Sequence, residues 1–563
     1  MNIEKTFAKA IKSHNKNNLK DAENLYNQVL KIDNNHLNSL HNLGIVSQDL
    51  NKSEKAITYF QKVIEIEPTF PGAHNNLGIV FQGLNELQKA INCYEKAIEI
   101  DPNNEHSHYN LGIIFRKLGE LEKAKNCLQK AIRINPEHLT ANNSLGMIFQ
   151  AEDEHQNAKK YYEKVIEIKP NHARAHNNLG VVFQKLKDVK KAKSCYEKAI
   201  QINPNIENYH SNLGAALQYL GEHQKSKKSY EKAIEINPNH SGSCHNLASL
   251  LQQLGDYHKA KYYSEKTIEL DPKNHIAHNN LGTIFYDLAE IQKSISCYKK
   301  AIEINPTYTD AYWNLYSATS CIDEALSILK KLYEIDNNYP NAKIMISALE
   351  GFKGNFNEFN NLLDSSEADY PYTRSVSWVF SLPKLPILFS NRWDFFKSII
   401  QMTDNSRPFY EFGVWTGFSF QYFIKTFKKG FGFDTFTGLP ETWGANPEGT
   451  YTSHGSIPKI KGGEFIVGKF EDTLPVFFSK ERPMASLINF DADLYSSTLC
   501  ALKNSNKVID EKTILVFDEF LMNKNWEQDE FKALNEFCDN LGFNYEVLAV
   551  SFNTKQVAVK LKK

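Results

Sequence analysis

The sequence predicts a multidomain protein in which an all-α solenoid is followed by an α/β domain with a doubly wound sheet. Residues 1–340 repeat one pattern every 34 residues, which is typical of stacked helix pairs. From Arg407 onward, short apolar runs alternate with helical patterns, as in a mostly parallel sheet covered by helices. We predict a connector over residues 341–395 and the sheet domain over residues 396–563.

Composition excludes several classes of protein. The 563-residue chain has 65 basic and 66 acidic residues, so its net charge of −1 gives no electrostatic basis for binding nucleic acid or an anionic membrane. The N-terminus lacks the apolar core of a signal peptide, and no apolar run is long enough for a membrane span. We therefore expect a cytoplasmic protein with no nucleic-acid partner and no membrane span.

Three columns of residues define the repeat. The first helix of each unit carries a glycine, the second carries an alanine or serine, and a proline follows, where it cannot continue the helix. The columns are Gly44, Gly78, Gly112, Gly146, Gly180, Gly214 and Gly282; Ala56, Ala90, Ala124, Ala158, Ala192, Ser226, Ala260 and Ser294; and Pro68, Pro102, Pro136, Pro170, Pro204, Pro238, Pro272 and Pro306. This length and spacing resemble the tetratricopeptide repeat, which implies about nine units with degenerate units at the C-terminal end.

The cysteines predict neither disulfides nor a zinc site. Cys93, Cys127, Cys195 and Cys297 differ by multiples of 34, so they occupy one column of the repeat and are expected to fill small apolar core positions. No two of the eight cysteines form a CxxC pair.

A column of asparagines accompanies the glycines and has two interpretations. Its members are Asn42, Asn76, Asn110, Asn178, Asn212, Asn246, Asn280 and Asn314. Either the amides stabilise each repeat, or they line the concave face of the solenoid and bind the backbone of an extended protein or peptide partner. Both interpretations stay open at this point.

Alternating apolar runs predict the elements of the second domain. Strands are expected at 409–415, 430–434, 464–468, 485–490 and 513–517, and a final antiparallel hairpin at 545–552 and 556–561. An aromatic segment, residues 378–393, precedes them. It is too apolar for a flexible linker, so it is expected to pack between the solenoid and the sheet domain or to lie over the crevice.

Two predicted strands deliver carboxylates to one edge of the sheet. Asp491 and Asp493 follow one apolar run, and Asp518 and Glu519 follow the next. Ligands of open α/β sheets bind at the carboxyl ends of the strands. Oxygen donors suit Mg²⁺, so these carboxylates are expected to converge on one crevice that holds this ion.

The first two strands end in residues that suit a nucleoside ligand. Gly413 and Gly417 allow backbone to approach a ligand, although such glycines also serve simple turns. Asp434 ends the next strand, where an acid can accept both hydroxyls of a ribose or cap a helix.

Five motifs together are more specific than each alone. The sheet domain carries, in order, EFGVWTG, FDTFTGLPETW, GKFEDTLP, INFDADLYSST and FDEF. They resemble the macrocin O-methyltransferase family over about 160 residues, from Pro408 to the C-terminus. The resemblance implies a class I methyltransferase fold ending in an antiparallel hairpin. It also implies S-adenosyl-L-methionine and Mg²⁺ as cofactors and a sugar hydroxyl as the acceptor.

Roles for individual residues follow from the same resemblance. The implied cofactor-binding residues are Glu411, Gly413, Gly417, Asp434, Gly468, Glu471 and Asp472; the metal ligands are Asp491, Asp518 and Glu519; and the general base is Asp493. The family usually has a second aspartate at position 519, so the longer glutamate is expected to shift or lose one metal contact. His454 is a second base or a surface histidine, and Trp443 and Tyr451 form a lid or simply pack within their loop.

The sequence thus supports two functions of different classes. The first is a Mg²⁺-assisted, S-adenosylmethionine-dependent O-methyltransferase that acts on a sugar hydroxyl of a glycan or glycosylated product, with the solenoid recruiting a partner. The alternative is a non-catalytic interaction scaffold with a degenerate methyltransferase domain. A repeat-bearing glycosyltransferase is disfavoured, because it would need a much larger catalytic region.

Overall fold

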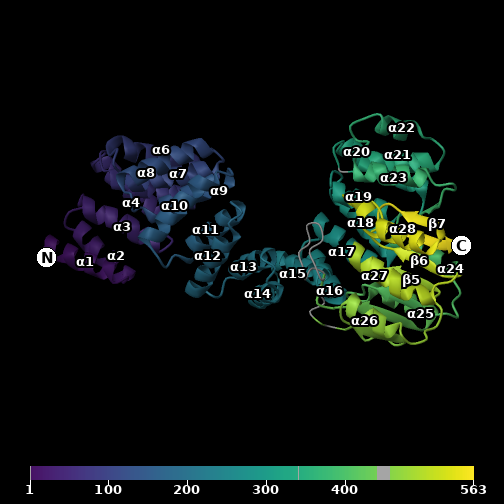
Figure 1. The fold of residues 1–563 in the computed structure, drawn as a ribbon. Helices are drawn as coiled ribbons and strands as arrows, with labels where there is room; N and C mark the ends of the chain where they lie inside the picture. Colours follow the sequence, from purple (N-terminus) through teal and green to yellow (C-terminus); the bar gives the residue numbers. More distant parts are fainter. Residues whose placement is uncertain (1, 340, 440–454, 456, 493, 563) are drawn as a thin grey trace. The chain divides into compact units, whose positions relative to one another are not determined.

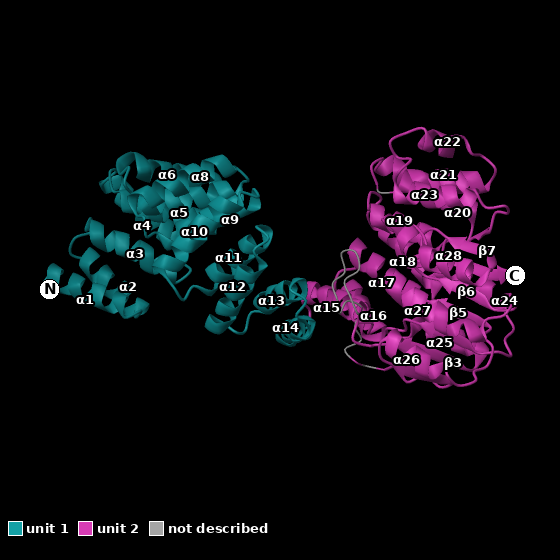
Figure 2. Cartoon of the chain, in the orientation of Figure 1, with its two compact units in different colours: residues 1–238 teal, residues 239–563 magenta. Residues whose placement is uncertain are grey.

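The computed structural model of the protein describes residues 2–339, 341–439, 455, 457–492 and 494–562. The chain forms two compact units, residues 1–238 and residues 239–563 (Figure 2). The boundary between the units falls between two repeats. The last repeats therefore belong to the same unit as the sheet, and the predicted boundary at residue 340 marks only the end of the repeat pattern.

The first unit consists of consecutive antiparallel helix pairs (Figure 1). Its helices are α1 (Ile3–Asn15), α2 (Leu19–Leu30), α3 (Leu37–Asp49), α4 (Ser53–Ile66), α5 (Pro71–Gly83), α6 (Leu87–Ile100), α7 (Glu105–Lys117), α8 (Leu121–Ile134), α9 (Leu139–Ala151), α10 (His155–Ile168), α11 (Ala173–Lys185), α12 (Val189–Ile202), α13 (Glu207–Tyr219) and α14 (His223–Ile236).

The second unit begins with three further helix pairs and ends with the sheet domain. Its helices are α15 (Ser241–Gln253), α16 (Tyr257–Leu270), α17 (His275–Asp287), α18 (Ile291–Ile304), α19 (Thr309–Ala318), α20 (Ile322–Ile335), α21 (Ala342–Phe352), α22 (Asn357–Leu363), α23 (Pro371–Phe380), α24 (Arg392–Gln401), α25 (Phe418–Phe427), α26 (Phe470–Phe477), α27 (Tyr495–Ser505) and α28 (Glu530–Leu541). Two 3₁₀ turns, Asn506–Val508 and Trp526–Gln528, complete it.

Helices α1–α20 make ten pairs in the described chain, one more than the predicted nine. The additional pair is α1–α2, where the sequence pattern is hidden. Ala10 stands in the glycine column and Asn34 in the proline column, whereas Ala22 keeps the alanine column. Ala10 and Ala22 are both fully buried, so the first pair is packed like the others without their signature.

Ring packing explains the glycine column. A Cβ added at Gly78 would lie 2.7 Å from the ring of Tyr94, and one added at Gly180 would lie 2.6 Å from the ring of Tyr196. The tyrosine of the second helix thus lies directly on the backbone of the first. Its hydroxyl then donates to a glutamine of the first helix, as Tyr94 does to Gln82 at 2.8 Å. A side chain at the glycine position would separate the two helices.

The sheet joins eight strands among the described residues. They are β1 (Ile387–Leu388), β2 (Phe409–Phe412), β3 (Gly430–Asp434), β4 (Gly463–Val467), β5 (Leu487–Phe490), β6 (Ile514–Phe517), β7 (Asn544–Ser551) and β8 (Gln556–Lys562), in the spatial order β1-β7-β8-β6-β5-β2-β3-β4. Strands β4, β3, β2, β5 and β6 are parallel, and β8 runs antiparallel to both β6 and β7. The predicted hairpin is confirmed, and the edge strand β1 is an addition.

Helices cover both faces of this sheet. Phe409 and Leu487 point to the face covered by α24 and α25, whereas Tyr410 and Ile488 point to the face covered by α26, α27 and α28. This alternation follows from the two-residue period of a strand. The aromatic segment before the sheet lies against the repeats as expected, because Trp393 Nε1 donates to the carbonyl of Tyr286 in α17 at 2.6 Å.

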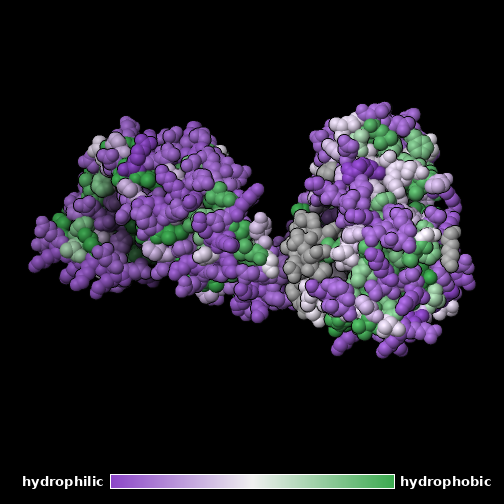
Figure 3. Space-filling view, in the orientation of Figure 1, coloured by the Kyte–Doolittle hydropathy of each residue, from purple (hydrophilic) through white to green (hydrophobic). Residues whose placement is uncertain are grey.

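The surface is largely hydrophilic. On the face drawn in Figure 3, the hydrophobic residues are scattered among polar ones. No helix in the described part of the chain is both long and apolar enough to cross a membrane.

Candidate active site

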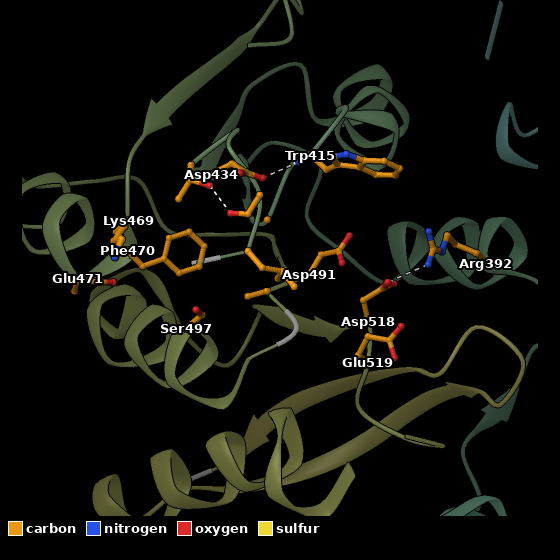
Figure 4. A pocket seen from close by; sticks show the side chains of 15 residues that line it. Arg392, Trp415, Asp434, Lys469, Phe470, Glu471, Asp491, Ser497, Asp518 and Glu519 are labelled. Carbon is orange, nitrogen blue, oxygen red and sulfur yellow. Dashed lines mark hydrogen bonds and ion pairs between the residues drawn. The ribbon is translucent and has the colours of Figure 1, made fainter. Parts of the chain in front are cut away.

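A cavity of about 280 Å³ opens at the carboxyl ends of β2, β3, β5 and β6 (Figure 4). Six of the residues predicted from the sequence line it: Gly413, Asp434, Glu471, Asp491, Asp518 and Glu519. They come from the ends of different strands and from the first turn of α26, so the parallel sheet brings together residues that are far apart in the chain. The predicted crevice therefore exists.

Four predicted residues do not line the cavity. Glu411 is buried beneath it, Gly417 packs toward Pro458, and Asp472 is exposed on α26. The N–H of Gly468 donates to the carbonyl of Asp434 at 3.0 Å, which ties the end of β4 to that of β3.

Asp493 lies outside the described residues, as do His454, Trp443 and Tyr451. Their predicted roles stay predictions.

Gly413 has a structural reason that the sequence did not reveal. Its φ is +90°, and a Cβ added there would lie 1.7 Å from the carbonyl oxygen of Asp491. The ends of β2 and β5 therefore approach each other so closely that only glycine fits. This also explains why β2 ends at Phe412, earlier than predicted.

The carboxylate of Asp434 holds the two loops on either side of it. Its Oδ2 accepts from the N–H groups of Val414 and Trp415, both at 2.7 Å, and its Oδ1 accepts from the N–H of Phe436 at 2.6 Å. Trp415 and Phe436 have φ values of +46° and +57°, a region that costs free energy for residues with side chains. Asp434 thus stabilises a strained backbone at the rim of the cavity.

Glu411 is a buried acid close to the cavity. Its Oε1 accepts from the hydroxyl of Ser419 and from Nδ2 of Asn489, the latter at 3.0 Å. Its Oε2 is buried with no hydrogen-bond partner among the described residues. Burial raises the pKa of Glu411 to about 8, with the nearby carboxylates of Asp518 and Asp434 contributing to the rise. The side chain is therefore neutral over most of the physiological range.

Two of the predicted metal ligands are paired with cations of the chain itself. Asp518 Oδ2 lies 3.0 Å from Nη2 of Arg392, and its Oδ1 accepts from Gln556. Glu519 Oε2 lies 2.8 Å from Nζ of Lys555. In Figure 4, Asp491 and Asp518 face the side on which Arg392 lies. Although burial acts to lower it, the pKa of Arg392 is raised overall by Asp518 and Asp491.

Sequence reasoning missed several lining residues. Arg392, Trp415, Lys469, Phe470 and Ser497 line the cavity together with the predicted residues. Lys469 and Phe470 stand beside Glu471 and could have been included from its motif. Arg392 carried no signal, because it lies 126 residues from its carboxylate partner in an aromatic segment with no motif.

Comparisons with known proteins concern the solenoid. Family models described as tetratricopeptide repeats match residues 37–70, 83–119, 107–138, 139–172, 173–206, 208–240, 229–262 and 275–308. No curated protein matches the chain.

Similar solved structures are also repeat proteins, according to two of the three titles. YrrB, a TPR protein with an unusual peptide-binding site, is 24% identical, and the match covers 33% of this chain and 96% of that one with a TM-score of 0.31. MamA is 28% identical over 29% of this chain and 96% of its own, with a TM-score of 0.27. PilF of Pseudomonas aeruginosa is 21% identical over 36% and 92%, with a TM-score of 0.33.

The period, the helix pairs, the ring-on-glycine packing and the family matches agree with one another. The chain therefore carries tetratricopeptide repeats across residues 37–308.

Proposed function

We propose that the sheet domain is an S-adenosylmethionine-dependent O-methyltransferase that acts on a sugar hydroxyl of a glycan or glycosylated product. The observation that carries this proposal is the cavity itself. It lies at the carboxyl ends of four parallel strands and is lined by residues of four of the five motifs that resemble the macrocin O-methyltransferase family. We further propose that the repeats bind a protein or peptide partner, the usual role of such solenoids.

The charge of the cavity suits a cationic cofactor. Five carboxylates line it, against the two cations Arg392 and Lys469. An acidic, half-enclosed cavity attracts a positively charged ligand such as a sulfonium. This charge balance supports S-adenosylmethionine over an anionic dinucleotide.

The order of the strands gives further support. A doubly wound parallel sheet that ends in an antiparallel hairpin is the outline that the resemblance implies, and β7 and β8 form such a hairpin. An ordinary dinucleotide-binding sheet would continue with parallel strands.

Roles for the chain's own groups follow from their positions. Asp434 would exchange one backbone N–H partner for a ribose hydroxyl, and Phe470 offers a ring beside the adenine position. Asp493 would accept the proton of the sugar hydroxyl. S-adenosylmethionine supplies a methyl group on a positive sulfur, which leaves as a neutral thioether.

The predicted Mg²⁺ site does not fit the described residues as they are arranged. Asp518 and Glu519 already have Arg392 and Lys555 as ion-pair partners, and within the described residues no three His, Cys, Asp or Glu side chains are grouped to hold a metal ion. Asp493, which lies outside them, is not part of this test. No step of the proposed reaction is therefore assigned to a metal.

Transfer of a labelled methyl group tests the proposal. The full chain is incubated with methyl-labelled S-adenosylmethionine and with cell-surface polysaccharide from cells that lack the gene. We expect label in the saccharide and a mass increase of one CH₂ group per methylated site, both lost in Asp493→Asn. Absence of label together with absence of cofactor binding would contradict the proposal.

A non-catalytic scaffold is the second candidate, and one observation favours it. Both carboxylate oxygens of Asp434 accept backbone N–H groups, so the site predicted for the ribose is filled by the protein itself. A scaffold would retain this arrangement as a structural clamp. It predicts a chain that binds its partner through the repeats and binds no S-adenosylmethionine.

A further inference from the structure

We propose that the repeats formed by α15–α18 are part of the active site, because they position two walls of the cavity. The first wall is the cofactor loop, residues 413–418, and the second is Arg392. This inference rests on the proposed function and assigns positioning residues that lie outside the sheet domain.

The first contact joins the α15–α16 turn to the cofactor loop. A Cβ added at Gly255 in this turn would lie 2.4 Å from Cγ2 of Thr416. Two residues further along, the ring of Tyr257 meets that of Phe418 edge-to-face, with the centroids 4.4 Å apart. The turn of the solenoid therefore packs directly on the loop that lines the cavity.

A second contact joins α17 to the start of α24. The hydroxyl of Tyr286 accepts from the backbone N–H of Arg392 at 3.2 Å, and its carbonyl accepts from Nε1 of Trp393 at 2.6 Å. These bonds fix the first residues of α24. The guanidinium of Arg392 is thereby held against Asp518, inside the cavity.

The loop needs such support because its own backbone is strained. Trp415 has a φ of +46°, a conformation that residues with side chains keep only when their surroundings impose it. Asp434 holds it from inside the cavity, and the α15–α16 turn holds the next residue, Thr416, from outside. Displacing the turn would move the loop, and with it the backbone that faces the cofactor.

Neighbouring turns of the solenoid provide a matched control. Gly221, in the turn between α13 and α14, has the same φ of +74° as Gly255 and ends the first helix of its repeat in the same way. A Cβ added at Gly221 would have no described atom within 4 Å. An alanine at either position carries the same backbone cost, but only the one at 255 presses on the cofactor loop.

Calorimetric titration of the full chain with S-adenosylhomocysteine tests the inference. We expect Gly255→Ala to bind about tenfold more weakly than Gly221→Ala, the size of effect expected from a methyl group forced into a filled contact. Gly255→Ala combined with Thr416→Ser, which removes the methyl group that clashes, should regain most of the affinity. The melting temperatures of the two single variants should be similar, because the backbone strain is shared.

The outcomes separate this inference from the proposed function. If the wild type binds and Gly255→Ala binds as well as Gly221→Ala, the repeats do not position the loop and only the inference fails. The same conclusion follows if Thr416→Ser gives no recovery. If the wild type itself binds no S-adenosylhomocysteine, the proposed function fails and the inference fails with it.

Discussion

Gly413 shows how one residue joins packing to the site. Its neighbour across the sheet is the carbonyl oxygen of Asp491, 1.7 Å from where a Cβ would be placed. We predict that Gly413→Ala lowers the free energy of unfolding of the sheet domain by about 3 kcal/mol or more, since backbone cannot yield as a flexible side chain would. Gly542→Ala has a similar φ of +69° in open space and should cost about 1 kcal/mol. Urea denaturation compares the two, and equal losses would show that the close approach is absent.

Glu411 makes the stability of the domain depend on pH. Its folded-state pKa of about 8 lies above its usual value of 4.5, so between these values the folded chain keeps a proton that the unfolded chain releases. Stability therefore falls as pH rises through this window, by up to about 1.4 kcal/mol per pH unit for one proton. Glu411→Gln should flatten the dependence between pH 5 and pH 8, measured by denaturant unfolding at several pH values. An unchanged slope in the variant would contradict the buried, neutral carboxyl.

The predictable part of the site consists of residues fixed by strand ends. Gly413, Asp434, Asp491 and Asp518 each end or follow a strand, and parallel strands deliver such residues to one edge. Arg392 could not be predicted, because its place depends on contacts with distant parts of the chain. The loss of Glu411 from the cavity surface could not be predicted either, because one residue of register decides which face of β2 it occupies.

At the scale of elements, the asparagine column stabilises the stacking of repeats at four described positions. Nδ2 of Asn110, Asn212 and Asn314 donates to an asparagine of the preceding repeat, at 3.2, 2.9 and 3.0 Å, and that of Asn76 bonds to His41 at 3.0 Å. These bonds favour the structural interpretation of the column at these positions. The capture of an extended peptide by the same amides stays a prediction.

We predict that Asn177→Ala lowers the stability of the solenoid by about 1 kcal/mol, because Asn212 loses its acceptor. Asn143 stands one repeat earlier in the same column, and its printed bond is to Met147 within its own helix. Asn143→Ala should therefore cost less than about 0.5 kcal/mol. Circular dichroism during urea denaturation measures both, and equal effects would show that the bond between repeats contributes nothing.

Element prediction succeeded where a pattern was local. The hairpin, the five parallel strands and most helix pairs follow from periodicity and from glycine and proline positions. The pair α1–α2 lacked that signature, and the two-residue strand β1 is too short to give a pattern, since only its pairing with β7 defines it.

At the scale of the whole molecule, the chain divides within the repeats rather than after them. Residues 239–563 form one compact unit that contains repeats and sheet together, and contacts from α15 and α17 reach the walls of the cavity. A change of sequence pattern shows where repeats end but not which of them pack on the next domain. This division is the reason for assigning the last repeats a part in the site.

The central claim is that the acidic cavity binds a sulfonium nucleoside through Asp434, and calorimetric titration of the full chain with S-adenosylmethionine tests it most directly. We predict one bound cofactor per chain, with affinity at least about tenfold lower in Asp434→Ala, since the ribose hydroxyls lose a charged acceptor. Asp539→Ala, an exposed acid at the end of α28, should bind as the wild type does. A wild-type chain that binds no cofactor, or an Asp434→Ala variant that binds as tightly as the wild type, would contradict the account.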